Sequence, residues 1–318
     1  MRKRLSNTNI GSYKYPESEL VPVINYDVWV GGSQVTSTNQ NDVLGDGKIS
    51  YIPAHNTLTL NGADIEGEGI VGILLARENA AIILAKGSVN RIIGGTYGIA
   101  SMGNLTISGT GALTATRGSS NSGITVCSAA ATLTISGGAQ VTASGEFGLN
   151  SDNNMVISGL GTKVEAVGLG LTGTGIHAVN NITISQGAQV TASGRRSGIY
   201  AVNGNISISG TNTIVEAACT KTRGNFGIVG RSIAISSGTV KASTASIRYS
   251  AMSKAPDLSG YDNVRITAGP TKTDGSGTSV IDKNVLTNDH IDDYHYLKIE
   301  AGPGLGSAAQ PAFRRLMK

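Results

Sequence analysis

The chain is poor in several residue types on which most folds and functions depend. Of 318 residues, two are cysteine and one is tryptophan, while aromatic residues make up 4% and charged residues 14%. No apolar run approaches the roughly 20 residues of a transmembrane segment. Cys127 and Cys219 are too isolated to form a disulfide framework, and no metal-ligand spacing is present. The net charge of +4 predicts neither a disordered chain nor a nucleic-acid-binding protein.

Glycine, in contrast, is abundant at 44 residues, and three short patterns recur in a fixed order. The first is a Gly-Ile pair, the second has the form Leu-Thr-Ile-Ser-Gly, and the third has the form Val-Thr-Ala-Ser. Copies of the second pattern begin at residues 58, 82, 105, 133, 155, 182, 206 and 233, which gives a mean step of 25 residues. Each pattern alternates apolar and polar residues and therefore predicts a strand with one buried face.

Three short strands in each repeat predict an all-β fold, a single-stranded right-handed parallel β-helix of about nine turns. One turn cannot bury its own apolar face, but the turns above and below can cover it. The pair Gly31-Gly32 predicts an N-terminal β-hairpin cap, and residues 53–56 predict the turn of a second hairpin. We expect Trp29 to pack into this cap. Asparagines before the second pattern predict a stacked ladder that closes a corner of each turn. These asparagines are Asn104, Asn154, Asn181 and Asn205.

The patterns divide the chain into five segments. Asn9–Tyr15 resembles His290–Tyr296, since both contain the spacing I-x-x-Y-x-Y. We therefore expect the chain to be one unit of a tandem array, with neighbouring modules of the same polypeptide as partners. The expected segments are a linker or tail of a preceding module (1–22), the hairpin cap and first strand (23–62), the β-helix repeats (63–250), the C-terminal capping strands (251–301) and a linker or disordered tail (302–318).

The N-terminal part also contains a distinctive motif. The sequence Y-D-V-W-V-G-G-x-Q-V-T-S from Tyr26, then D-V-L-G-D-G-K-I-S-Y, N-T-L-T-L-N and the repeats, resembles a module of large surface proteins from gut Firmicutes. The repeats are similar to β-helical carbohydrate-binding domains of the pectate-lyase-like superfold, and the resemblance extends to Ala301. It implies an extracellular or cell-surface location and contact with polysaccharide. The family's calcium-binding positions do not carry over, because no matching acidic cluster is present, and we expect no cofactor.

Catalysis by a polysaccharide lyase or a glycoside hydrolase requires clustered carboxylates. Between residues 98 and 245, the acids that face outward on the third strands are Glu165 and Glu216. They lie two turns apart, about 9.6 Å from the strand spacing, which approaches the upper limit for an inverting pair. No other feature supports catalysis, so a lyase or hydrolase is the alternative prediction and a solvated surface is the simpler interpretation.

A binding strip is predicted where the first strands face outward. Asn150, His177 and Tyr200 fall on three successive turns, and the loops beside them carry Arg117, Arg195, Arg196, Lys221 and Arg223. We expect a non-catalytic, adhesin-like module that binds polysaccharide or host glycan, with charge-assisted bonds from the arginine pair to uronate or sulfate groups. An exposed polar edge without a ligand is the other interpretation and would make the chain a structural spacer. The predicted contact residues are Asn150, His177, Tyr200, Arg195 and Arg196.

Overall fold

The computed structural model describes residues 22–67, 71–117, 120–270 and 277–302. About half of the chain is strand and about 2% is helical, and the stacked parallel strands form a β-solenoid of about seven turns. The turn number is smaller than the predicted nine, and antiparallel strands close both ends of the stack. The predicted terminal segments 1–22 and 302–318 lie, apart from one residue each, outside the described residues.

The first sheet is formed mainly by the strands that contain the Gly-Ile pattern. Ile124 pairs with Ile99 on one side and with Leu149 on the other, so the aliphatic residues of this pattern stack in register. Only its terminal strands, β1 and β2, run antiparallel to their neighbours. In spatial order the strands are β2 (Ser33–Thr36), β1 (Asn25–Val30), β6 (Ile73–Leu75), β9 (Ile99–Ser101), β12 (Ile124–Val126), β15 (Phe147–Ser151), β18 (Thr174–Ala178), β21 (Ser197–Ala201) and β24 (Ile228–Val229).

The second sheet contains the Leu-Thr-Ile-Ser-Gly copies. Leu105 pairs with Leu133 as predicted, but Ile82 pairs with Ile107 and not with Leu105. This shift of two residues leaves the same side chains buried, because the side-chain period of a strand is two. In spatial order the strands are β25 (Ile233–Ile235), β22 (Ile206–Ile208), β19 (Ile182–Ser185), β16 (Asn154–Ser158), β13 (Thr132–Ile135), β10 (Leu105–Gly109), β7 (Ala80–Leu84), β4 (Thr57–Leu60) and β3 (Ile49–Ile52).

The third sheet contains the Val-Thr-Ala-Ser copies, and their predicted register is confirmed. Val141 pairs with Leu113 and with Val164 of the neighbouring turns. The last three strands of this sheet pair antiparallel and cap one end of the solenoid. In spatial order the strands are β28 (Ser279–Ile281), β27 (Val264–Gly269), β29 (Tyr296–Ala301), β26 (Thr239–Thr244), β23 (Ile214–Cys219), β20 (Gln189–Gly194), β17 (Lys163–Gly168), β14 (Gln140–Gly145), β11 (Ala112–Thr116), β8 (Val89–Gly94) and β5 (Asp64–Gly67).

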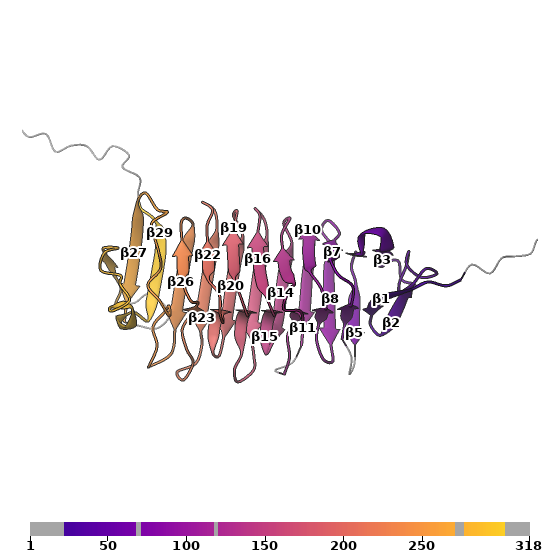
Figure 1. Cartoon of the computed structure of the whole chain (residues 1–318), viewed down its shortest axis with the longest axis horizontal. Coiled ribbons are helices and arrows are strands. Elements are labelled where there is room, and N and C mark those ends of the chain that lie inside the picture. The colour runs from indigo at the N-terminus through magenta and orange to yellow at the C-terminus, as the bar shows by residue number, and fades with distance from the viewer. Residues whose placement is uncertain (1–21, 68–70, 118–119, 271–276, 303–318) are drawn as a thin grey trace, which may run out of the picture.

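The strands lie across the long axis of the molecule, with a cap at each end (Figure 1). At the N-terminal end, β1 and β2 join through Gly31 and Gly32, which have φ values of 55° and 84°. A second hairpin joins β3 and β4 through the 3₁₀ turn η2 (Pro53–His55), and both hairpins were predicted. Trp29, however, is only half-buried on the outer face of β1, because its neighbours Val28 and Val30 face the interior. A further 3₁₀ turn, η3 (Ile291–Asp293), precedes β29.

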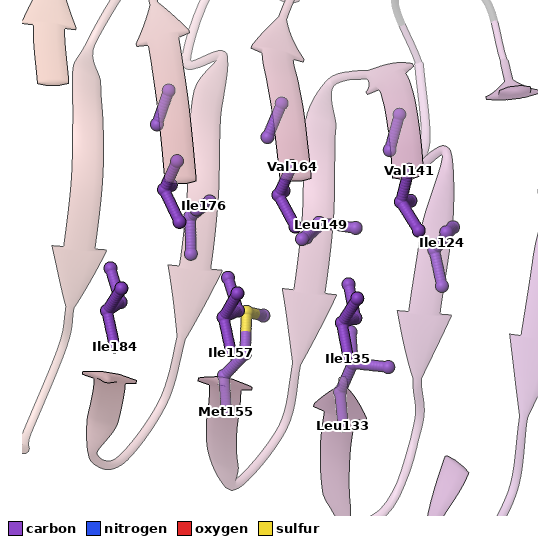
Figure 2. Close-up of a cluster of buried hydrophobic side chains, with 14 of the residues drawn as sticks. Ile124, Leu133, Ile135, Val141, Leu149, Met155, Ile157, Val164, Ile176 and Ile184 are labelled. Atoms are coloured by element: carbon purple, nitrogen blue, oxygen red, sulfur yellow. The ribbon is translucent and has the colours of Figure 1, made fainter. Parts of the chain in front are cut away.

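The core is a set of aliphatic columns that run along the axis (Figure 2). Ile135, Ile157 and Ile184 pair in register on successive turns, and all three are fully buried. Each such side chain contributes about 2–3 kcal/mol through burial, and its partners above and below supply most of the cover. The columns therefore explain how a repeat that is too thin to fold alone becomes stable in a stack.

Where each third-sheet strand meets the following first-sheet strand, the glycine of the Gly-Ile pair has no room for a side chain. A Cβ atom at Gly175 would lie 2.7 Å from the backbone oxygen of Ala166 and 2.8 Å from that of Gly198. Such distances are well below ordinary contact, so the glycine of each Gly-Ile pair is required by space. The end of each third-sheet strand consequently comes close to the start of the next first-sheet strand.

The predicted asparagine ladder is confirmed at another corner. Asn181 Nδ2 donates to Asn154 Oδ1 at 3.2 Å, and Asn181 Oδ1 accepts from the backbone N–H of Asn205 at 2.9 Å. Asn104 Oδ1 accepts from the backbone N–H of Thr132, and its Nδ2 donates to Asn79, which extends the ladder by one turn. These asparagines therefore satisfy turn backbone groups and have a structural role.

Candidate functional site

The structure brings the predicted outward residues of the first sheet into one column, here called the first-sheet ladder (Asn150, His177 and Tyr200). Backbone pairing places Asn150 beside His177 and His177 beside Tyr200. The side chains then bond to one another: His177 Nδ1 lies 2.7 Å from Asn150 Oδ1, and Asn150 Nδ2 donates to Thr125 Oγ1 at 3.1 Å. The polar groups of Asn150 and His177 therefore form hydrogen bonds within the protein.

Ring contacts continue this column. The ring of Phe147 stacks on His177 at 4.5 Å between centroids, and His177 meets the edge of Tyr200 at 5.7 Å. The guanidinium carbon of Arg196 lies 4.9 Å from the centroid of the Tyr200 ring. Four of the five predicted site residues thus form one continuous chain of contacts, which holds the Arg196 side chain by a cation–π interaction.

The environment of His177 keeps its imidazole neutral. Burial lowers the pKa of His177 from 6.5 to about 4, and the positive charge of Arg196 acts in the same direction. The negative charge of Asp152 opposes both effects on this pKa but does not reverse them. At neutral pH the ladder therefore offers no positive charge of its own, and charge at this corner comes from the arginines and the lysine of the loops.

The loops that carry these cations form a hollow of about 470 Å³ at the corner between the third and the first sheet, and we call it the corner hollow. Its floor is the two-residue loop Arg195-Arg196 between β20 and β21, while its walls are the longer loops 169–173 and 220–227 on the adjacent turns. Unequal loop lengths on three successive turns thus create the depression. The corner hollow is lined by Leu171, Thr172, Arg195, Arg196, Lys221, Thr222, Arg223, Gly224 and Asn225.

The corner hollow is strongly basic. Four of its lining residues are cationic, and no acidic residue of the described part of the chain lines it. None of these four cations takes part in an ion pair among the described residues. Arg117, which we expected on the same strip, lies outside the hollow, where its Nη2 donates to Ser120 Oγ. Uncompensated cations in a concave site are suited to binding an anionic group.

The sequence did not identify three residues that shape this site. Phe147 covers His177, Thr172 donates its hydroxyl hydrogen to Glu146, and Asn225 contributes a side-chain amide to the hollow wall. The available signal was the loop length, because a two-residue connection between two longer ones predicts a depression. The direction of the Phe147 ring, in contrast, depends on packing that residue patterns do not express.

The outward residues of the third sheet form the third-sheet ladder (Thr142, Glu165, Thr191, Glu216 and Lys241). Glu165 and Glu216 lie on opposite sides of Thr191, two turns apart, as the register predicted. Glu216 forms an ion pair with Lys241 on the next turn. Shallow hollows of about 320 and 340 Å³ lie on this face, one beside Glu165 and one beside Glu216. The two carboxylates therefore belong to separate depressions and do not converge on one point.

Two further observations apply to the described residues alone. No group of three or more His, Cys, Asp or Glu side chains there is arranged to hold a metal ion. No helix in the described segments is long and apolar enough to span a membrane. In comparisons with protein-family models, curated proteins and solved structures, none was found to match this chain.

Proposed function

We propose that the chain is a non-catalytic β-solenoid module of a cell-surface or secreted protein, and that it binds anionic polysaccharide or host glycan at the corner hollow. The single observation that supports this function is a depression lined by four cations, which form no ion pair with the described residues, and by no acid of the described part of the chain. Arg195 and Arg196 provide planar forks that can each bond two oxygens of one anionic group. Neighbouring modules of the same polypeptide would present the rod away from the surface.

The first-sheet ladder has a supporting role in this function. Asn150 and His177 bond to each other and one face of Tyr200 is covered by Arg196, so the ladder mainly positions the Arg196 guanidinium. Asn150, His177 and Tyr200 remain half-buried and form the border along which a neutral part of the glycan would lie. This differs from the predicted role of the same residues as the principal contacts.

The enzymatic alternative has weaker support. Glu165 and Glu216 are separated by Thr191, and Glu216 is paired with Lys241, whereas an acid–base pair requires two carboxylates that face one substrate bond. The spacer alternative requires that the basic hollow has no ligand. Both alternatives make different predictions for binding, so one experiment separates them from the proposed function.

A glycan array is the appropriate test. Wild-type protein should bind acidic glycans, and Arg195→Ala/Arg196→Ala should lose at least about tenfold in affinity, because charge-assisted bonds contribute about 1.5–3 kcal/mol each. Arg231→Ala removes one positive charge from an exposed site on a different corner and should bind like wild type. A silent array would support the spacer, and release of shortened sugar products would support the enzyme. Binding that survives the double substitution would contradict the proposed site.

A further inference from the structure

Charge along the corner between the third and the first sheet is distributed unevenly. The cations of the corner hollow occupy the turns of residues 195–196 and 220–227. On the N-terminal side of the loop 169–173, the corner residue is Glu146, whose carboxylate accepts the hydroxyl hydrogen of Thr172. Asp152 lies near the same end of the first-sheet ladder, 3.4 Å from Asn150 Nδ2. The corner is therefore positive over the two turns of the hollow and carries an acid, Glu146, on the N-terminal side of them.

This distribution limits which anionic glycans can bind. A polyuronate that lies along the rod places a carboxylate on each sugar, and some of these would approach Glu146 and Asp152. Glu146 is two turns from the Arg195-Arg196 loop, about 10 Å by the strand spacing, where unscreened like charges still repel. A glycan whose charge is confined to one group avoids that repulsion and leaves its neutral sugars beside the negative end.

The donors in the corner hollow come from two loops. Arg195 and Arg196 supply two guanidinium groups on the floor, and the wall loop 220–227 supplies Lys221 and Arg223 together with the hydroxyl of Thr222 and the amide of Asn225. A carboxylate has two coplanar oxygens, which a single arginine fork can satisfy. A sulfate or phosphate ester has three terminal oxygens that diverge, so it can accept from several of these donors at once.

We infer that the corner hollow selects a glycan bearing a single tetrahedral oxyanion, a sulfate or phosphate ester, over a glycan whose charge comes from repeated carboxylates. This inference rests on the proposed function and makes it specific. The ester occupies the space between the arginine floor and the lysine-containing wall. Neutral sugars extend along the first-sheet ladder toward the uncharged Asn150, away from the four cations of the hollow.

The test uses four sugars that differ only at carbon 6: glucose, glucuronate, glucose 6-sulfate and glucose 6-phosphate. Each is titrated into full-length protein while the arginine side-chain NMR signals are followed. Both esters should bind about fivefold or more tightly than glucuronate, and glucose should bind most weakly. The two ester titrations distinguish sulfate from phosphate as the source of the oxyanion. Glucuronate that binds as tightly as the esters, or four sugars that leave the signals unchanged, would overturn the inference.

Two variants make the test independent of folding defects. Lys221→Ala/Arg223→Ala changes two exposed side chains and should reduce the preference for esters over glucuronate by at least about threefold. Glu146→Gln keeps the acceptor for Thr172 and should raise the affinity for an oligomer of galacturonate about fivefold, with glucose 6-phosphate unchanged. An unchanged galacturonate affinity would contradict the role of Glu146.

Failure of the proposed selectivity can be distinguished from failure of the proposed function. If glucuronate matches the esters while the glycan array still shows binding that depends on Arg195 and Arg196, the selectivity is wrong and the glycan-binding function stands. If no array glycan depends on these arginines, the proposed function itself fails. Equal loss of every sugar in Lys221→Ala/Arg223→Ala would indicate general charge attraction and would also overturn the selectivity.

Discussion

The outer faces of the first and third sheets are built by the same repeat, yet they have different chemical properties. On the first sheet, Asn150, His177 and Tyr200 are half-buried and bond to one another. On the third sheet, Glu165 and Thr191 are exposed, and the nearest organised interaction is the surface ion pair between Glu216 and Lys241. Identical strand spacing therefore produces a closed column on one side and an open surface on the other.

The difference between the two faces originates at the corner where each third-sheet strand meets the glycine before the next first-sheet strand. Phe147 directly precedes Gly148 and Arg196 lies two residues before Gly198, and at this tight turn both side chains lie over residues of the first sheet. No ring or guanidinium contact of this kind covers the third-sheet ladder among the described residues. Local chain geometry thus determines which polar ladder is sheltered and which stays solvated, and four predictions test this conclusion.

The largest effect is expected for Gly175→Val. Its side chain would overlap the backbone oxygen of Ala166 and the backbone nitrogen of Ser193, both 2.7 Å from a Cβ atom at this position. The free energy of unfolding should fall by about 4 kcal/mol or more, as measured by urea denaturation. Thr183→Val, on the outer face of the second sheet, is the control and should change stability by less than about 0.5 kcal/mol. A Gly175→Val protein as stable as wild type would contradict the claim that this position has no room for a side chain.

Acid should lower the stability of the protein through protonation of His177 in the first-sheet ladder. Its folded pKa of about 4 lies below the unfolded value of 6.5, so the unfolded chain takes up the proton first as the pH falls. Stability is therefore lost between about pH 6.5 and pH 4, by up to about 3 kcal/mol. The difference in unfolding free energy between wild type and His177→Asn, measured from pH 7 to pH 4, isolates this effect from other titrating groups. A difference that does not vary with pH would contradict the burial of His177.

A smaller effect is expected for Arg196→Ala. Loss of the cation–π contact with Tyr200 should cost about 1 kcal/mol of unfolding free energy. Loss of the nearby positive charge should also raise the pKa of His177, which an NMR titration of the imidazole measures. Arg195→Ala is the matched control, because Arg196 is the arginine over the Tyr200 ring, and it should cost less than about 0.5 kcal/mol. Equal costs for the two substitutions would show that the ring contact contributes nothing.

The smallest effect is expected on the open surface. Lys241 and Glu216 are 41% and 45% exposed, so Lys241→Ala should lower the free energy of unfolding by less than about 1 kcal/mol. Wild-type protein at high salt should show the same small loss, since salt screens exposed charges. A loss larger than that of Arg196→Ala, measured in the same denaturation series, would remove the distinction between the two faces.

Much of the fold could be predicted because apolar alternation marks each strand and glycine marks each corner. The one register error occurred at Ala80–Leu84, where an uninterrupted apolar run gives no unique alignment. The outward position of Trp29 could also have been predicted from the sequence, since Val28 and Val30 on either side of it face inward on the same strand.

The site was predictable only in part. The order Asn150, His177, Tyr200 followed from repeat register, and the arginines followed from their loops. That the ladder bonds internally, and that Arg196 covers Tyr200, depends on side-chain directions which repeat spacing does not specify. Arg117 was included because its loop occupies the same corner, but that loop lies three turns before the floor of the hollow, too far to contribute to it.

Confinement of ligand contact to the corner hollow is tested most directly by the backbone amide NMR spectrum of the protein saturated with glucose 6-phosphate. The signals of residues 195–196 and 221–225 should shift, while those of Thr142, Glu165 and Thr191 should stay within experimental error. Shifts concentrated on the third-sheet ladder, or a spectrum that the sugar does not change, would contradict the corner hollow as the binding site.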